Sequence, residues 1–460
     1  MIYDLVIKNG TLVTGKGVYQ SDLAIQAEKI SEIGIGLSGR QEIDAGGKLV
    51  IPGGVDPHVH LEMPTPTTVT SDDWQTGSKA AAFGGTTTVI DFIEPAYPGQ
   101  PLLDSYRDYL QKAQGRSAID FSFHMTLCSA DADTLQQVPG VVAAGMSTFK
   151  VYTTYPGFHL SDEDLLAVLE AVAKARGLVL VHSESDAIIQ SEVNKLRQIG
   201  HLTVSDFPDS RPPVAEKEAI ERVLSLASYA SAPVYIVHVS TRDGASAIRR
   251  ARQVGQAAWG ETCPQYLLLD ESKLKTGGFN GAKFVCSPPL RLPVDQAALW
   301  SALQENSLQT VGTDHCAFNF IGQKDLGKDS FLDIPSGLPG IELRLALLYT
   351  YGVKPGRLSL QQWVEACSTT PARLFGLLPR KGELSPGADA DVVLFDPERS
   401  QTITQALLHE NVDYTPYEGL QLAGKVTDTF LRGQALVRDE AWVAEKAKGV
   451  FLPGTPFQAS

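Results

Sequence analysis

Residues 161–184 read SDEDLLAVLEAVAKARGLVLVHSE, and they join a helical pattern directly to a strand pattern. The helix is predicted to begin at Ser161, to carry acidic residues in its first turn and to close on Gly177. Four apolar residues, LVLV, then form a short strand that ends in His182. A helix followed at once by a buried strand is the repeating unit of α/β proteins.

The same alternation extends through the middle of the chain. Strand-like runs occupy residues 53–60, 86–91, 120–127, 147–153, 178–184, 233–240, 256–261 and 308–314. Helical patterns lie between most of them, for example at residues 213–230 and 241–255. Eight such repeats predict an α/β fold, a (β/α)8 barrel of the TIM type. An open doubly wound sheet is the alternative, but no GxGxxG motif follows the first strand.

Both ends of the chain are rich in short β-strand patterns. Near the start, YDLVIKN and TLVTG are separated by an NG pair that we interpret as a turn. Because chain ends often lie close together, we expect one small β-sandwich domain built from both termini. The expected division is residues 1–52 and 379–440 for the sandwich, 53–378 for the barrel and 441–460 for a C-terminal extension. This extension is expected to be extended, either packed on a neighbouring subunit or frayed.

Composition limits the classes of partner. The 460 residues include 39 Lys and Arg against 53 Asp and Glu, a net charge of −14, which argues against nucleic-acid and membrane partners. The five cysteines form no CxxC pair, which indicates a reducing compartment. No basic-then-apolar leader and no run of 18 apolar residues is present, so we expect a cytoplasmic location.

Chemistry in a (β/α)8 barrel gathers at the C-terminal ends of the strands. The unusual residues that end these runs are His58, His60, Lys150, His182, His238 and Asp314. Two histidines spaced by two on a strand face the same side and can chelate one metal ion. A single strand-end histidine is more often a hydrogen-bonded core residue, and a single aspartate a salt-bridge partner. Together the four histidines and Asp314 form a nitrogen and oxygen donor set that suits Zn²⁺ or a similar divalent metal.

Lys150 is the exception among these strand ends. A protonated amine beside divalent cations would be repelled by them. One solution is a desolvated lysine that forms a Schiff base with a carbonyl substrate. The other is carboxylation by CO2, which converts the amine into an anionic carbamate that can bridge two metals. The surrounding metal ligands favour the carbamate, although the residues alone leave both alternatives open.

Ten segments of the chain resemble one family. They are GGVDPHVHLEMP (53–64), GGTTTVIDF (84–92), FKVYTTY (149–155), LVLVHSES (178–185), VYIVHVST (234–241), GETCPQYLLLD (260–270), SPPLR (287–291), GTDHCAFNFIGQKDLGKDSF (312–331), SGLPGIE (336–342) and GADADVVLFD (387–396). On these segments the chain resembles the dihydropyrimidinases and hydantoinases, cyclic amidohydrolases of the amidohydrolase superfamily. The HxH motif alone is weak evidence for this family, whereas the ten segments together are specific to it.

The resemblance implies a binuclear metal site with two divalent ions, most often Zn²⁺, and an assembly of four identical subunits, or of two. His58, His60 and Asp314 would bind one metal, and His182 and His238 the other. Lys150, N6-carboxylated by CO2, would bridge them. A hydroxide held between the metals would attack a ring carbonyl, with Asp314 moving the proton.

The resemblance also implies the substrate contacts. Tyr155 would donate to the developing oxyanion, and the backbones of Ser287 and Ser336 would bind the ring amide. At position 336 relatives often carry Asn, so Ser336 departs from the family pattern. The expected reaction opens 5,6-dihydropyrimidines, 5-substituted hydantoins or both to N-carbamoyl amino acids.

Glu62 bears on the class of ring. Dihydroorotases and allantoinases resemble HxHxR at this place, where the arginine grips an anionic group, but this chain has Glu62. We expect this anion to repel a carboxylated ring, unless Glu62 simply faces solvent. Segments 61–73 and 151–160, with Met63, Tyr152 and Phe158, are expected to border an apolar or aromatic ring substituent.

Three other functions compete with this reading. An allantoinase or dihydroorotase is disfavoured by Glu62 and by the GETCPQY segment. A non-catalytic assembly protein like the collapsin-response-mediator relatives is disfavoured because all six ligand positions are filled. A Schiff-base lyase acting through Lys150 has no need of the metal ligands.

Overall fold

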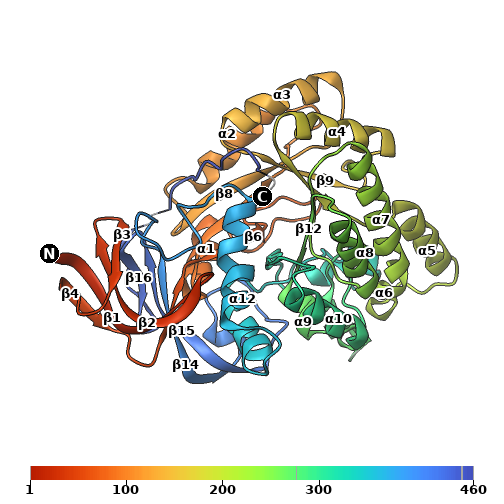
Figure 1. The fold of residues 1–460 in the computed structure, drawn as a ribbon. Coiled ribbons are helices and arrows are strands. Elements are labelled where there is room, and N and C mark those ends of the chain that lie inside the picture. The colour runs from red at the N-terminus through yellow and green to blue at the C-terminus, as the bar shows by residue number, and fades with distance from the viewer. Residues whose placement is uncertain (1, 276, 447–448, 459–460) are drawn as a thin grey trace.

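The computed structural model describes residues 2–275, 277–446 and 449–458. Its centre is a ring of eight parallel strands in sequential order (Figure 1). These strands are β6 (Gly54–Val59), β7 (Thr86–Ile93), β8 (Asp120–Thr126), β9 (Thr148–Tyr152), β10 (Leu178–His182), β11 (Val234–Ile236), β12 (Ala258–Thr262) and β13 (Thr310–Val311). A parallel bridge between Val59 and His315 closes the ring. The expected (β/α)8 barrel is therefore confirmed, and the open sheet is excluded.

Helices connect the strands and cover the outside of the barrel (Figure 1). They are α1 (Trp74–Phe83), α2 (Leu102–Ala113), α3 (Ala132–Ala143), α4 (Asp162–Lys174), α5 (Asp186–Gln198), α6 (Phe207–Ser210), α7 (Pro213–Tyr229), α8 (Arg242–Gln253), α9 (Pro264–Leu268), α10 (Pro293–Gln304), α11 (Arg344–Leu348), α12 (Leu360–Val364) and α13 (Thr370–Leu374). In α4 the Ser161 side chain accepts from the backbone N–H of Asp164, as the sequence predicts. Leu165, Val168 and Val172 lie on the buried face of this helix, at helical spacing.

A second sheet combines both ends of the chain into the expected β-sandwich domain. Its strands are β1 (Tyr3–Thr14), β2 (Gly17–Gln26), β3 (Lys29–Gly34), β4 (Gly39–Asp44), β5 (Leu49–Pro52), β14 (Val392–Thr402), β15 (Gln421–Leu431), β16 (Gln434–Arg438) and β17 (Ala441–Trp442). Antiparallel pairing of β5 with β14 joins the two ends. Leu23 and Val50 from the first part pack with Val392 and Phe430 from the second in one buried cluster.

One local prediction in this sheet was wrong, and one strand was not predicted. Asn9 and Gly10 form no turn, because β1 continues through them with a register shift between Ile7 and Gly10. Asn9 has φ 61°, so the pair forms a bulge that keeps the strand paired with β2. Strand β4 was not predicted because GRQEID lacks apolar alternation, yet it pairs with β1.

The C-terminal segment packs on its own chain. The backbone N–H of Leu452 donates to the carbonyl of Phe121 in β8, and the N–H of Phe457 donates to the carbonyl of Arg176. The side chain of Leu452 is 1% exposed. The expectation of a frayed end is therefore wrong for the described residues 449–458, since barrel loops and strand ends provide hydrogen-bond partners. Packing of this segment on a neighbouring subunit stays a prediction.

The connection between β14 and β15 reaches from the sandwich domain back to the barrel loops. The backbone N–H of Asn411 donates to Oδ1 of Asp72 at 2.9 Å. The Asp413 carboxylate accepts from the N–H groups of Phe320 and Ile321 at 2.6 and 3.0 Å. We call residues 411–413 the domain strap. It ties the loop after β6 and the loop after β13 to the smaller domain.

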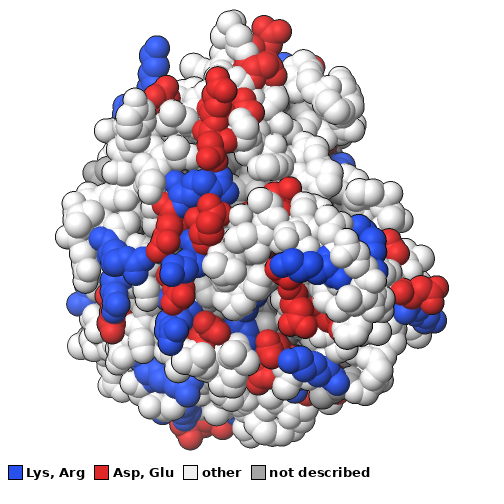
Figure 2. Space-filling view, turned by 90° about the vertical axis from the view of Figure 1, so that its right-hand side faces the viewer, with Lys and Arg blue, Asp and Glu red and all other residues white. Residues whose placement is uncertain are grey.

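Figure 2 shows Lys and Arg beside Asp and Glu on the face it presents, without a continuous basic area. Within the described ranges, no helix is both long enough and apolar enough to cross a membrane.

Candidate active site

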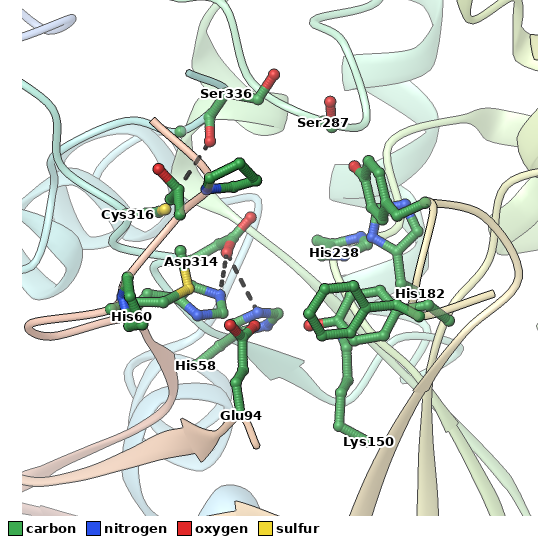
Figure 3. Close-up of a pocket in the computed structure, with 18 of the residues that line it drawn as sticks. His58, His60, Glu94, Lys150, His182, His238, Ser287, Asp314, Cys316 and Ser336 are labelled. Carbon is green, nitrogen blue, oxygen red and sulfur yellow. Dashed lines mark hydrogen bonds and ion pairs between the residues drawn. The ribbon is translucent and has the colours of Figure 1, made fainter. Parts of the chain in front are cut away.

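All six strand-end residues line one cavity of about 590 Å³ at the C-terminal edge of the barrel. His58 lies in β6, Lys150 in β9 and His182 at the end of β10. His60 follows β6 directly, whereas His238 and Asp314 lie two and three residues after the ends of β11 and β13. Figure 3 shows their side chains directed into the cavity. Parallel strands of a barrel end at the same rim, which is why residues more than 250 positions apart in the chain meet here.

His58, His60 and Asp314 form the tighter group. Nε2 of His58 and Nε2 of His60 each lie 3.2 Å from Oδ1 of Asp314 (Figure 3). One potential ligand atom from each residue lies within 4.8 Å of the others. Burial acts to raise the pKa of Asp314, but His58, His60 and Lys150 outweigh it, and the net effect lowers that pKa.

His182, His238 and Lys150 line the other side of the same cavity. The imidazole centroids of His182 and His238 are 4.6 Å apart. Burial lowers the pKa of both histidines, so both present neutral rings with a free lone pair. Burial also lowers the pKa of Lys150 to about 8, so a substantial share of its amine is uncharged near that pH.

Two buried glutamates orient the histidines, and the sequence reasoning missed both. Oε1 of Glu261 lies 2.7 Å from Nδ1 of His58, and Oε2 of Glu184 lies 2.8 Å from Nε2 of His182. Each leaves the other ring nitrogen available as a metal ligand. Glu261 ends the 256–261 run and Glu184 follows His182 by two, so the strand-end rule could have identified them.

Three site residues adopt left-handed backbone conformations. The φ angles of Tyr155, His238 and Asp314 are 76°, 39° and 51°. Such conformations cost roughly 1–3 kcal/mol each and persist where the surrounding structure imposes them. Their concentration in one cavity is typical of a functional site.

Tyr155, Ser287 and Ser336 also line the cavity, and Figure 3 shows the two serines across it from Lys150. Burial raises the pKa of Tyr155 to about 12, which keeps its phenol protonated and able to donate. The Arg211 guanidinium carbon lies 5.1 Å from the centroid of the Tyr155 ring.

A buried lysine joins the two segments that carry these serines. Nζ of Lys324 donates to the carbonyls of Val285 and Pro335, at 3.0 Å each. The N–H of Gly337 also donates to the Val285 carbonyl at 3.0 Å. Residues 285–287 and 335–337 are thus held side by side, and Ser287, Ser336 and Gly337 of these segments line the cavity.

The position of Glu62 corrects one prediction. Glu62 is not among the residues that line the cavity, and its carboxylate accepts from Nη1 of Arg116 at 2.7 Å. It therefore cannot repel a bound ring in the way we expected. Of the described residues that line the cavity outside the strand-end set, Glu94 alone carries a formal charge.

The donor set fits a divalent metal centre. Nδ1 of His60 is buried without a hydrogen-bond partner in the described part of the chain. His58 and His238 are neutral because burial lowers their pKa values well below the usual range. Neutral imidazoles beside an ionised aspartate are the ligands that zinc and similar metals prefer.

Comparison with known proteins identifies the family. Residues 49–436 match the amidohydrolase family. The chain is 43% identical to a D-hydantoinase of Geobacillus stearothermophilus over 458 residues, covering 99% of this chain and 97% of that protein. It is 40% identical to a D-phenylhydantoinase of Escherichia coli O1:K1 / APEC over 460 residues, covering 98% of each.

A solved structure supports the same family assignment. The crystal structure of dihydropyrimidinase from Brevibacillus agri NCHU1002 matches with a TM-score of 0.97 at 42% identity, covering 99% of both chains. The chain therefore belongs to the amidohydrolase family, and within it to the dihydropyrimidinase and hydantoinase group of cyclic amide hydrolases.

Proposed function

We propose that this enzyme opens 5,6-dihydropyrimidines, 5-substituted hydantoins or both to N-carbamoyl amino acids. Water adds to a ring carbonyl carbon, the bond from that carbon to the ring nitrogen breaks, and the nitrogen gains a proton. The observation that supports this best is the single cavity in which six potential ligands face Tyr155, Ser287 and Ser336.

Two divalent ions would be held by His58, His60 and Asp314 on one side and by His182 and His238 on the other, and this donor set suits Zn²⁺. When bound, such ions polarise a carbonyl and make water acidic. Lys150 would bridge the two groups as a carbamate. Its neutral amine attacks CO2, an N–C bond forms and a proton leaves. The lowered pKa of Lys150, about 8, supports this step because only the uncharged amine is nucleophilic.

The remaining roles follow from position. The pKa of Asp314 is lowered, and its carboxylate contacts His58 and His60. Asp314 would therefore take a proton from water and return it to the leaving nitrogen. Tyr155 would donate its phenolic proton to the carbonyl oxygen as charge develops there. The backbones at Ser287 and Ser336 would bind the ring amide, with Lys324 holding the two segments in place.

The cavity wall favours neutral rings. Met63, Pro64, Tyr152 and Phe158 form an apolar part of the wall, and Lys150 is the only Lys or Arg among the described lining residues. An arginine that could hold a ring carboxylate is thus absent from the described wall, which disfavours the dihydroorotase and allantoinase alternatives.

A substrate panel on enzyme with quantified metal, supplied with bicarbonate, tests the proposal. We expect turnover of dihydrouracil and 5-phenylhydantoin and little turnover of dihydroorotate. Activity on dihydroorotate alone would contradict the proposal, and a borohydride-trapped adduct on Lys150 would favour a lyase instead. Assembly into a homotetramer or dimer stays a prediction, which light scattering would check.

A further inference from the structure

Glu94 is a cavity carboxylate to which the proposed reaction gives no role. It follows β7 directly, at the same rim as the predicted ligands, and it lines the cavity. Figure 3 shows its side chain rising into the cavity between His60 and Lys150. It thus occupies the second strand end of the barrel, where the other strand ends discussed above supply ligands.

Among the described residues, no Lys or Arg forms an ion pair with Glu94, although His60 and Lys150 lie near it. None of the ion pairs found between described residues includes it, and its hydrogen-bond partner is the phenol of Tyr152. Burial raises the pKa of Glu94, and the nearby His60 and Lys150 only partly oppose this rise. Glu62 differs from Glu94 in its ion pairing and in its position, because it pairs with Arg116 and lies outside the cavity.

Part of the cavity wall next to Glu94 is apolar. Pro95 and Ala96 continue from it along the wall, and Met63, Tyr152 and Phe158 line the same cavity. In such surroundings an unpaired charge interacts more strongly with a ligand than it would in water. A substituent that carries a carboxylate would be repelled, and one that carries an ammonium would be attracted.

We propose that Glu94 is a specificity-determining residue that favours cyclic amides whose ring substituent ends in an ammonium group. This inference rests on the proposed function, and it assigns to Glu94 the repulsion of carboxylated rings that Glu62 cannot provide. The favoured substrate class is therefore the 5-(aminoalkyl)hydantoins, over 5-(carboxyalkyl)hydantoins of equal length.

The test compares kcat/KM for 5-(4-aminobutyl)hydantoin and 5-(3-carboxypropyl)hydantoin, each relative to dihydrouracil with the same enzyme preparation. In the wild-type enzyme we expect the aminobutyl ring to be preferred by about tenfold or more. Glu94→Gln should lower that preference by about tenfold. Glu62→Gln is the matched control, because it removes a nearby carboxylate that lies outside the cavity, and it should keep the wild-type preference.

Glu94→Leu separates charge from packing. It fits the apolar wall and should turn the preference toward 5-butylhydantoin. Metal content is measured for every variant, so loss of metal is not mistaken for changed specificity. If Glu94→Gln turns over all the rings and keeps the wild-type preference, the role of Glu94 is overturned and the proposed function stands. Absence of turnover of every ring by metal-loaded enzyme would overturn both.

Discussion

Nε2 of His182 lies 2.8 Å from Oε2 of Glu184, the residue two positions along the chain. The same carboxylate oxygen accepts from Nη1 of Arg211 at 2.5 Å. Arg211 outweighs burial and lowers the pKa of Glu184 to about 2. Glu184 is therefore an ionised acceptor at any ordinary pH, and it holds the imidazole so that Nδ1 is the nitrogen left to bind a metal.

Glu184→Gln should lower metal affinity. A neutral amide orients the His182 ring less well, and loss of such a partner typically costs about 10–100-fold in affinity. Metal titration with a competing chelator measures the change. Glu62→Gln should bind metal as the wild type does. Equal affinity in wild type and Glu184→Gln would contradict the orienting role.

Lys150→Ala should lose both metal and activity. The carbamate would no longer be available to join the two ligand groups, so metal content measured by mass spectrometry should fall. A short carboxylic acid such as acetate fits the space left by the side chain and should restore part of the activity. A variant that keeps full activity without added acid would show that Lys150 does not bridge the site.

Asp314→Asn should fold normally, keep much of its metal and lose hydrolysis. The amide can still occupy the position beside His58 and His60, but it cannot accept a proton. Positioned acid–base groups contribute about 10²–10⁴-fold, so kcat should fall by that range. Near wild-type kcat in metal-loaded Asp314→Asn would remove Asp314 from proton transfer.

Lys324 should make stability depend on pH. Burial lowers its pKa to about 7, against about 10.4 in an unfolded chain. Below about pH 7 both states bind the proton and the cost of burying the charge is fully present. As pH rises from 7 toward 10, the folded state releases the proton before the unfolded state, so stability increases.

The size of this effect is bounded. One group contributes at most about 1.4 kcal/mol per pH unit. Lys324→Met removes the titration, so the unfolding free energy of wild type minus that of the variant should rise between about pH 7 and pH 10. Denaturant unfolding at several pH values measures this difference. Parallel profiles would contradict the buried-amine account.

Leu452→Ala should destabilise the protein. Its buried side chain packs in one cluster with Val55, Phe92 and Leu180 of the barrel strands. Truncation of a buried leucine typically costs about 2–5 kcal/mol. Val450→Ala is the matched control, because Val450 is 43% exposed and contributes its carbonyl to Phe121. Equal unfolding free energies for the two variants would show that the segment contributes no core packing.

Most of the barrel was predictable because its strands are buried on both faces and read as apolar runs between helical patterns. The positions of the strand ends then predicted that His58, Lys150 and Asp314 lie together at one rim of the barrel. Strand β4 was not predicted because its polar residues show no alternation of apolar and polar positions. The NG pair was predicted as a turn because a left-handed Asn occurs in turns as well as in bulges.

Other parts of the site depend on contacts that no short sequence window contains. Lys324 joins carbonyls 39 and 11 positions away, and Arg116 neutralises Glu62 from 54 positions away. The pairing of Glu62 with Arg116 therefore could not be predicted from the position of Glu62 after HxH. Glu94 was not predicted for a different reason. The predicted run ends at Asp91, whereas β7 continues to Ile93, so Glu94 follows the observed strand and not the predicted one.

The domain strap changes how the smaller domain should be regarded. Asn411 and Asp413 hold the loops that follow β6 and β13, and both loops contribute residues that line the cavity. The shape of this cavity therefore depends on a segment with no catalytic side chain. An isolated barrel would lose these anchors. Exchanging the β14–β15 connection between related enzymes should consequently transfer loop geometry, which makes this connection a place to alter substrate range without touching the metal ligands.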